Sequence, residues 1–436
     1  MIETKTKLQR YGKYVDSGVE WLGEIPKHWK MKKIKFLSDI FNGDSLNELL
    51  KKRYESDDLK DLAYISSKDI NVNNSEIAYE NGLRIPKEDF SLKIAPSNSS
   101  LLCIEGGSAG RKIAFTNQEV CFVNKLACFK IKGNNYSKYL FFSLKGSPFQ
   151  TQFKLSMTGM IGGVSISSIN NFCLPLPPLS EQTKIAQFLD DKTSKIDVAV
   201  TIKEQQINLL KERKQILIHK AVTQGLNPNV TLEDSGVEWI GEIPEHWEVK
   251  RLKYVAEINY GISPNEKTYN NEGVGTVLVN GPVEYSKTAF GYTRSLKWTT
   301  EPVKFAKKGD LLFCLRGSTT GRLNLCHQDL SIGRGCASIR AKDNHQFMIK
   351  AITALKDQII ETFKGSTFPS ITSFELNNYS VPNPPLLEQK EISAYIETAS
   401  QKIEMAISLK QQEMEKLKEY KASLINSVVT GKVKVC

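Results

Sequence analysis

The sequence predicts an α+β fold in which two mixed α/β domains are separated by two long helices that pair as an antiparallel coiled coil, with a pseudo-two-fold relation overall. Three observations support this prediction. The segment at 16–29 returns at 234–247 with twelve of fourteen residues identical, which indicates a duplicated module. A second motif, PPLSEQ at 177–182, returns as PPLLEQ at 384–389. Each copy of this junction is followed by a long segment without Pro or Gly that is rich in Lys, Glu and Gln.

The bulk composition limits the class of protein. With 436 residues, the chain is long enough for roughly two to four domains, each with its own core. The net charge of +11 is compatible with nucleic acid, an acidic protein or an anionic membrane surface as partner, and does not choose among them. The eight cysteines include no C-x-x-C pair, so no zinc ribbon, redox pair or other metal site is expected. A charged N-terminus and the lack of an apolar run near the roughly 18–20 residues that span a bilayer predict a cytoplasmic protein.

The first domain is expected over 1–176 and the second over 229–383. Both carry short β-branched and aromatic runs bounded by turn residues, which is typical of strands. Helices are expected near 137–145 and 346–364. The strand candidates are 62–66, 100–105 and 121–132 in the first domain, and 276–280, 310–317 and 336–342 in the second.

The two domains share segments beyond the repeated opening. LLCIEGGSAGR at 101–111 aligns with LLFCLRGSTTGR at 311–322 when the Gly-Arg pairs are matched, and SINNFCLPLPPL at 168–179 aligns with ELNNYSVPNPPL at 375–386. Elsewhere the two sequences differ. We therefore expect two domains with a common frame and different variable parts.

A central helical region is expected over 177–228 and a C-terminal one over 384–436. Their aliphatic residues alternate steps of four and three, a mean period of 3.5 that indicates a coiled-coil seam. Lysines interrupt both seams at matching positions. The alternative is that each apolar stripe packs on its own domain. The predicted helix-pairing residues are Ile196, Val200, Ile207, Leu210, Leu217, Ile403, Ile407, Met414, Leu417 and Leu424.

No catalytic residues are predicted. Residues 106–110 match the G-x-S-x-G nucleophile elbow, but the second copy has Thr319 in place of Ser108, so a tight glycine turn is the better interpretation. Residues 383–386, NPPL, approach the N-P-P-aromatic motif of amino-group methyltransferases, yet Leu386 stands where the aromatic residue should be. There is no phosphate-binding G-x-x-x-x-G-K-[ST] loop, so the chain is not expected to use ATP.

Taken together, the repeated DSGVEWxGEIPxHW opening, the xPPLxEQ junction and the long helix after each junction resemble the specificity subunits of type I restriction–modification systems. The resemblance covers essentially the whole chain. It implies two target-recognition domains, at about 30–176 and 248–383, that each bind one half of a bipartite, asymmetric site in double-stranded DNA. It also implies that the conserved helices fix the spacer and that the chain itself is not an enzyme.

The resemblance further implies partners that carry the chemistry of defence against foreign DNA. Two modification subunits, adenine-N6 methyltransferases that use S-adenosylmethionine, are expected to dock on the helices. Restriction subunits with ATP-dependent translocase and endonuclease activity are expected to complete the complex, so ATP and Mg belong to the partners. The remaining alternatives are a coiled-coil protein scaffold without DNA specificity and the recognition part of a fused methyltransferase–nuclease.

Basic and amide residues on loops that follow strands are the candidates for DNA contact. Arg and Asn side chains can discriminate bases through paired hydrogen bonds, whereas Lys mostly neutralises phosphate. The loops GGSAGRK and RGSTTGR are the strongest candidates because they repeat in frame and differ in charge, although a solvated turn would show the same pattern. The predicted DNA-binding residues are Arg111, Lys112, Asn124, Lys125, Arg316, Arg322 and Arg334.

Overall fold

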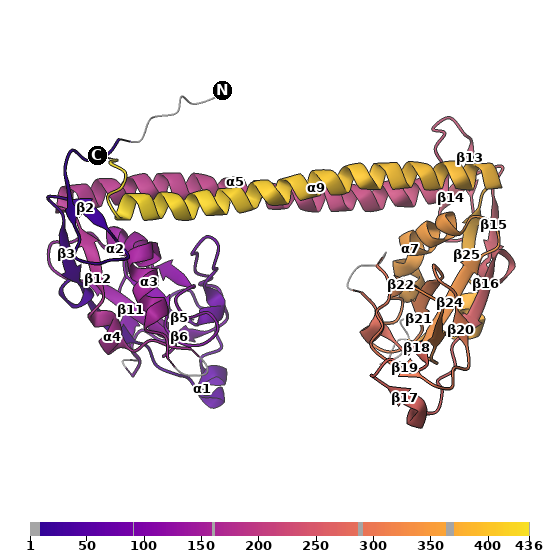
Figure 1. Ribbon diagram of the computed structural model, residues 1–436, viewed down its shortest axis with the longest axis horizontal. Helices are drawn as coiled ribbons and strands as arrows, with labels where there is room; N and C mark the ends of the chain where they lie inside the picture. The colour runs from indigo at the N-terminus through magenta and orange to yellow at the C-terminus, as the bar shows by residue number, and fades with distance from the viewer. Residues whose placement is uncertain (1–8, 90, 159–161, 287–290, 363–369, 436) are drawn as a thin grey trace. The chain divides into compact units, whose positions relative to one another are not determined.

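The computed structural model describes residues 9–89, 91–158, 162–286, 291–362 and 370–435. It divides into two compact units, which are considered separately (Figure 1). The first unit comprises Met1–Gln205 with Gln411–Cys436, and the second comprises Gln206–Lys410. Each unit therefore contains one mixed domain, part of the central long helix and part of the C-terminal one.

The first unit begins with the repeated opening and ends its domain with a strand that leads into the central helix. Its elements are β1 Tyr14–Asp16, β2 Glu24–Pro26, β3 Lys30–Lys33, η1 Ile34–Phe36, β4 Ser38–Asn42, α1 Glu48–Arg53, β5 Leu62–Ile65, η2 Ser67–Asp69, β6 Arg84–Ile85, β7 Ile94–Ala95, β8 Ser100–Cys103, β9 Ile113–Phe115, β10 Val120–Phe122, β11 Leu126–Ile131, α2 Ser137–Lys145, α3 Ser147–Leu155, α4 Ile166–Asn170, β12 Cys173–Leu176 and α5 Leu179–Gln224.

The second unit follows a similar order. Its elements are β13 Leu232–Asp234, β14 Glu242–Pro244, β15 Glu248–Arg251, α6 Leu252–Val255, β16 Ala256–Tyr260, η3 Glu266–Thr268, β17 Tyr269–Asn270, β18 Thr276–Val279, η4 Pro282–Glu284, β19 Trp298–Thr299, β20 Phe305–Ala306, β21 Leu311–Cys314, β22 Leu323–Leu325, β23 Leu330–Ile332, β24 Cys336–Ala341, α7 His345–Thr362, α8 Ser373–Asn378, β25 Ser380–Asn383 and α9 Leu386–Val429.

Each domain contains an antiparallel sheet and a mixed sheet. The antiparallel sheets run β4-β11-β8-β9 and β16-β24-β21-β22, and the mixed ones run β6-β5-β10-β7 and β17-β19-β18-β23-β20. In both mixed sheets one central pair is parallel, β5 with β10 and β18 with β23. The predicted mixed α/β class is thus confirmed for both domains, including the helices expected near 137–145 and 346–364; residues 363 and 364 lie outside the described residues.

Both faces of the antiparallel sheet are buried, which explains the nearly continuous apolar runs in the sequence. Along β11, Ala127 and Phe129 face one core with α2 and α3, whereas Leu126 and Cys128 face the core of the mixed sheet. This alternation follows from the two-residue period of a strand. In the second domain, Phe313 and Leu312 of β21 point to opposite cores in the same way.

The two long helices pack together in antiparallel directions. α5 has 46 residues and α9 has 44. In the first unit the beginning of α5 meets the end of α9, where Ile185 and Leu189 share a core with Val428. In the second unit the end of α5 meets the beginning of α9, where Val222 shares a core with Ile392. The predicted helix pair is therefore confirmed, and the outer ends of both helices also complete the cores of the domains.

Candidate nucleic-acid interface and its helical support

Several loops of the first domain gather at one edge of the antiparallel sheet. Because β4 and β8 run opposite to β11 and β9, the ends of the first two strands and the beginnings of the other two meet at this edge. We call it the loop edge. It carries residues 43–47, 104–112 and 123–125, and the loop after β5 joins it because Val123 N–H bonds to Ile65 O at 2.9 Å.

The predicted DNA-binding residues of the first domain all lie on this loop edge. Arg111 and Lys125 are exposed, and Lys112 and Asn124 are partly buried. Lys112 donates a hydrogen bond from Nζ to Ser67 O, so it also fastens the loop that follows β5. The Cys103 thiol lies close by: burial raises its pKa, whereas Lys112 and Lys125 act in the opposite direction. The structure thus brings these basic side chains together around one end of β8.

The second domain has an equivalent loop edge with different side chains. The loops 261–265, 315–322 and 333–335 occupy it, and Leu315 N–H bonds to Gly335 O as Ile104 N–H bonds to Lys125 O. Arg316 and Arg334 are exposed on it, and Arg322 is partly buried. Arg322 donates to Ser286 O at 2.9 Å.

The predicted match of the two Gly-Arg pairs holds within the turns, and the strand registers differ by one residue after it. The turns agree through the Gly-Arg pairs. Gly110 N–H and Gly321 N–H bond to Cys103 O and Cys314 O, and Arg111 N–H and Arg322 N–H bond to Ser108 O and Thr319 O. Leu102 then pairs with Ile113, but Phe313 pairs with Leu323, so the second loop is one residue shorter. The first domain therefore has one additional residue, Lys112, after the matched Gly-Arg pair: Cys103 N–H bonds to Lys112 O, whereas Cys314 N–H bonds to Arg322 O.

The G-x-S-x-G segment is a tight turn. Gly106 and Gly110 have φ of +84° and +73°, and the matching Gly317 and Gly321 have +87° and +81°. A Cβ on Gly110 would lie 2.8 Å from the ring of Phe153, so close packing of α3 also requires glycine here. The turn interpretation is confirmed.

Lys68 is a further candidate for DNA contact at the loop edge, and sequence reasoning missed it. It is exposed in η2, the turn whose Ser67 O receives the Lys112 side chain. Ser66 and Asp69 hold this turn through reciprocal side-chain to backbone hydrogen bonds, the capping-box pattern of S-x-x-D. That pattern could have identified the turn, but only the pairing of β5 with β10 places it at the loop edge.

The repeated opening anchors the start of each long helix. In the first unit Trp29 Nε1 donates to Glu181 at 3.1 Å, and His28 Nε2 lies 2.6 Å from the same carboxylate. In the second unit Trp247 Nε1 donates to Glu388 at 3.0 Å, and His246 Nε2 lies 2.7 Å from it. The two motifs that repeat in the sequence are therefore partners in space. The glutamates stand in the first turns of α5 and α9, where the helix dipole also favours a negative charge.

The glutamine of each junction closes the same connection. Gln182 Nε2 donates to Pro177 O at 3.0 Å, and Gln389 Nε2 donates to Pro384 O at 2.9 Å. These bonds hold the Pro-Pro turn against the first helical turn. Leu386 begins α9 with half of its side chain exposed, consistent with a hinge and not with a base-stacking site.

The predicted helix-pairing residues all lie at buried or partly buried positions. Ile196, Val200, Ile207, Met414 and Leu424 are buried, and Leu210, Leu217, Ile403, Ile407 and Leu417 are partly buried.

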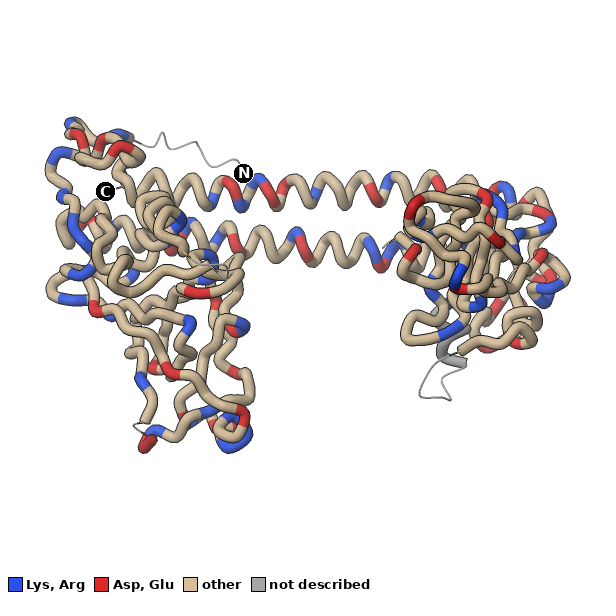
Figure 2. Tube along the Cα trace, turned by 60° about the horizontal axis from the view of Figure 1, so that its bottom comes forward, with Lys and Arg blue, Asp and Glu red and all other residues tan. Residues whose placement is uncertain are grey.

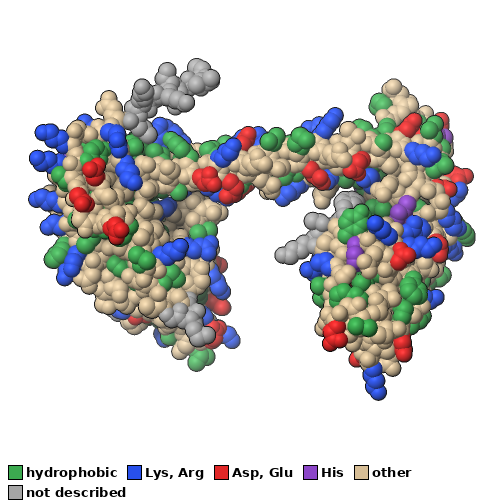
Figure 3. All heavy atoms as spheres, viewed as in Figure 1, with side chains coloured by type: hydrophobic (Ala, Val, Ile, Leu, Met, Phe, Trp, Pro, Cys, Tyr) green, Lys and Arg blue, Asp and Glu red, His purple; other side chains and the backbone are tan. Residues whose placement is uncertain are grey.

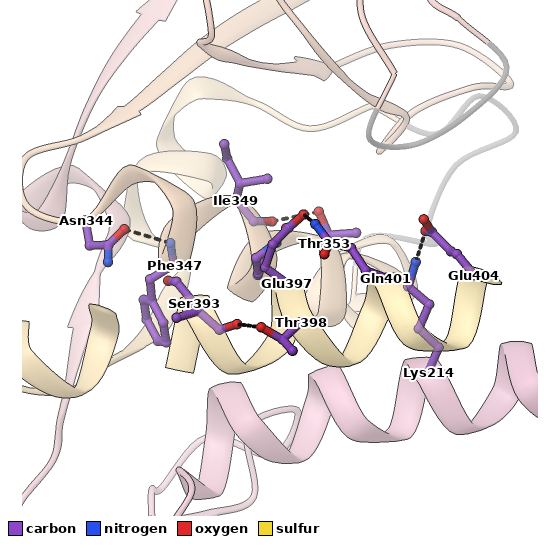
Figure 4. A network of polar contacts seen from close by, with 12 residues as sticks. Lys214, Asn344, Phe347, Ile349, Thr353, Ser393, Glu397, Thr398, Gln401 and Glu404 are labelled. Carbon is purple, nitrogen blue, oxygen red and sulfur yellow. Dashed lines mark hydrogen bonds and ion pairs between the residues drawn. The ribbon is translucent and has the colours of Figure 1, made fainter. Parts of the chain in front are cut away.

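Lys203, Lys214 and Lys421, which interrupt the seams, form ion pairs with the opposite helix. In the first unit Lys203 pairs with Glu413, and Lys421 pairs with Asp197. In the second unit Lys214 pairs with Glu404 (Figure 4). Each step forward along α5 is matched by a step back along α9, as the antiparallel direction requires. These pairs therefore contribute to the register of the two helices.

Helix α7 is tied to α9 by a polar network. Lys350 is buried and lies 3.2 Å from Glu397, whose pKa is lowered by the hydrogen bond and charge of this lysine. Gln401 also donates to Glu397, at 3.0 Å, in the group drawn in Figure 4. This network links the second domain to the helix that follows it.

Lys and Arg are interspersed with Asp and Glu along both long helices (Figure 2), and side chains of both signs are visible on the surface of the helix pair (Figure 3). Among the described residues, no group of three or more His, Cys, Asp or Glu side chains is arranged to hold a metal ion. No helix in the described ranges combines the length and the apolar character needed to cross a membrane.

Comparison with known proteins gives consistent matches. The family model described as type I restriction modification DNA specificity domain matches residues 26–211 and 244–418. A putative type I restriction enzyme MjaX specificity subunit of Methanocaldococcus jannaschii is 27% identical, covering 95% of this chain and 96% of that one. The EcoBI specificity subunit of Escherichia coli is 21% identical, covering 88% and 81%.

Two solved structures share the fold. A chain from work on complex assembly and conformational transition of the type I R-M system aligns with a TM-score of 0.72 and 18% identity, covering 94% of this chain and 99% of that one. The HsdS subunit from Thermoanaerobacter tengcongensis aligns with a TM-score of 0.54 and 20% identity, covering 94% and 98%.

Proposed function

The chain belongs to the type I restriction–modification DNA specificity family, and we propose that each of its two domains recognises one half of a bipartite, asymmetric DNA site. The observation that carries this proposal is the pair of equivalent loop edges. They share strand order and turn geometry, yet Glu105 of the first corresponds to Arg316 of the second. Two domains with one frame and different loop residues are suited to two different half-sites.

The roles of the loop residues follow from their chemistry. Arg316 and Arg334 are exposed guanidinium groups that could bond to both acceptors of a guanine edge. Lys112 and Lys125 carry point charges suited to phosphate, which supports affinity without sequence preference. Asn124 has the amide that pairs well with adenine.

The helix pair would keep the spacer between half-sites constant. α5 and α9 are continuous over 46 and 44 residues, and seam ion pairs in each unit oppose sliding. At 1.5 Å per residue, removing seven residues from a helix shortens it by roughly 10 Å, which is about three base-pair steps.

The catalytic activities would reside in partner subunits. Two modification subunits with S-adenosylmethionine would dock on the exposed faces of α5 and α9, and restriction subunits would supply ATP- and Mg-dependent cleavage of foreign DNA in the cytoplasm. The family match does not favour the scaffold or the fused-enzyme alternative.

The test is co-expression with a cognate modification subunit, followed by mapping of methylated adenines. We expect one split target sequence. Replacing residues 30–176 by those of another family member should change one half-site only, and deleting seven residues from both helices should change the spacer only. A domain exchange that altered both half-sites would refute the proposal.

A further inference from the structure

A cavity of about 360 Å³ lies in the second unit, beside the contact between His246 of the repeated opening and Glu388 of α9. Its wall includes Pro244 and His246 of the repeated opening, Glu388 and Glu391 of α9, and Leu226, which follows α5. One side is therefore the His–Glu pair described above, and the opposite side is the chain that leaves the end of α5.

In the first unit the corresponding place is filled by Tyr11. Its hydroxyl donates to Glu181 at 3.1 Å, and its ring lies 5.5 Å from His28 and 5.7 Å from Trp29, measured between ring centroids. The side chain of Tyr11 is buried, and the residue that precedes the second opening by the same number of positions is the exposed Asn229.

The filled and open places share a tryptophan, a histidine and a glutamate, although Glu391 beside the open place corresponds to Lys184 in the first unit. Glu181 accepts hydrogen bonds from Trp29 and Tyr11 and contacts His28. Glu388 has the equivalent tryptophan and histidine, and within the described residues no tyrosine reaches it. The side chain of Glu388 is 32% exposed, whereas that of Glu181 is 19% exposed. This difference is expected because Tyr11 covers Glu181 and no equivalent tyrosine covers Glu388 among the described residues.

We propose that this cavity is a docking seat for a tyrosine side chain of a partner protein. Tyr11 shows the chemistry that the seat accepts: an aromatic ring that packs at an angle against histidine and edge-on against tryptophan, with a hydroxyl that donates a hydrogen bond to the glutamate. The carboxylates of Glu388 and Glu391 favour a hydrogen-bond donor and repel an acidic side chain. The inference rests on the proposed function in taking the modification subunit as the partner that supplies the tyrosine.

The seat is tested first with p-cresol, the tyrosine side chain in isolation, by NMR titration of the full-length chain. We expect one saturable site, with toluene binding at least tenfold more weakly because it cannot donate to Glu388. Leu226→Trp should close the seat and abolish the site. Lys432→Trp is the matched control, because Lys432 follows Gly431 as Leu226 follows Gly225, beside the seat that Tyr11 already fills.

Removing the internal tyrosine gives an independent check. Tyr11→Ala should open the equivalent seat and raise the number of p-cresol sites from one to two. An unsaturable response of the wild-type chain, or a site that survives Leu226→Trp, would overturn the proposal.

The partner is tested by affinity for the modification subunit. Leu226→Trp should weaken the complex at least tenfold, and Lys432→Trp should leave it unchanged. Equal affinity of both variants would overturn the assignment of the partner. If wild type and Lys432→Trp both failed to form the complex, the proposed function would fail, and the p-cresol titration would still decide whether the seat exists.

Discussion

The indole N–H of Trp247 bonds to the carboxylate of Glu388 at 3.0 Å, and this contact joins the repeated opening of the second domain to the first turn of α9. Trp29 and Glu181 form the same contact in the first unit. The two pairs differ in one respect, because Tyr11 provides Glu181 with a further donor.

Trp247→Phe should loosen the start of α9 more than Trp29→Phe loosens the start of α5. Phenylalanine keeps the ring and removes the donor, and a hydrogen bond to a charged group contributes about 1.5–3 kcal/mol. Among the side chains that the structure describes, Glu388 then keeps His246, whereas Glu181 keeps His28 and Tyr11. The hydrogen-exchange rates of the backbone amides at 390–394 and 183–187 measure how readily the first turns of α9 and α5 unfold locally. Equal loss of protection in both helices would contradict the role of Tyr11.

Asp197→Asn should destabilise the first unit strongly. Lys421 is buried, and its Nζ lies 2.6 and 2.7 Å from the two carboxylate oxygens of Asp197. Removing the negative charge leaves a buried cation, which costs about 3 kcal/mol. The equivalent pair in the second unit, Lys214 with Glu404, has a glutamate side chain that is 65% exposed.

The second pair is therefore the control. Glu404→Gln should cost less than about 1 kcal/mol, since exposed ion pairs contribute little. Thermal unfolding of both variants gives the comparison. The double variant Asp197→Leu with Lys421→Met should regain most of the stability, and failure to regain it would place the loss elsewhere.

Lys145 makes the stability of the first unit depend on pH. The pKa of Lys145 is lowered to about 7, first by burial and then by the charge of Lys421, while Asp197 acts in the opposite direction. Its Nζ donates to Ser75 at 2.8 Å. Because the folded pKa is below the unfolded value, the unfolded chain binds more protons between these values, and the contribution to stability rises with pH.

Lys145→Met should remove this dependence. Below pH 7 the buried Lys145 of the wild type is charged and its full energetic penalty is present. The free energy of unfolding of the variant should therefore exceed that of the wild type by the largest amount there. The gain should shrink by about 1–2 kcal/mol between pH 7 and pH 9. Urea unfolding at several pH values, with Asp197 and Lys421 unchanged, measures the difference. A gain that stays constant over this range would show that Lys145 is not the group involved.

Arg334→Ala should weaken binding of the assembled complex to its DNA about tenfold, because one exposed guanidinium of the second loop edge is lost. Lys307→Ala is the control: this exposed lysine precedes β21, at the opposite edge of the same sheet. Titration at several salt concentrations, with substitutions in either half-site, gives the outcome. Altered preference in the half-site of the first domain would be inconsistent with separate domains.

The features predicted from sequence are those with a local or repeated signal. The seam residues such as Ile196 and Met414 follow a 3.5-residue period, and the turn at Gly106 repeats at Gly317. Contacts between distant segments have no such signal. The repeated opening and the junction motif are both visible in the sequence, but the bond from Trp29 to Glu181 spans 152 positions.

Other features depend on strand pairing and on differences between the copies. The turns align Arg322 with Arg111, but in strand pairing Arg322 stands opposite Cys314 as Lys112 stands opposite Cys103, a difference that the sequence match cannot reveal. Tyr11 precedes the repeat and has no counterpart, so comparison of the copies passes over it. Lys68 reaches the loop edge only because β5 runs parallel to β10.

The glycines that end the long helices should differ in their tolerance of alanine. Gly225 and Gly431 have φ of +75° and +71°, the left-handed conformation common after helix ends. A Cβ on Gly225 would lie 3.1 Å from the ring of Trp247, whereas one on Gly431 would lie 2.4 Å from Pro26. Gly236 has φ of +67°, and a Cβ added there would have no atom within 4 Å. An alanine at this position therefore measures the cost of the left-handed backbone conformation alone.

We therefore expect a graded series in thermal unfolding. Gly236→Ala should cost about 1 kcal/mol, the strain of a left-handed non-glycine residue. Gly225→Ala should cost slightly more, because Trp247 must move by a few tenths of an ångström. Gly431→Ala should cost about 2–3 kcal/mol, since the rigid ring of Pro26 cannot move away without displacing β2. If all three variants lost the same stability, the contacts of the helix ends with the repeated openings would contribute nothing to the fold.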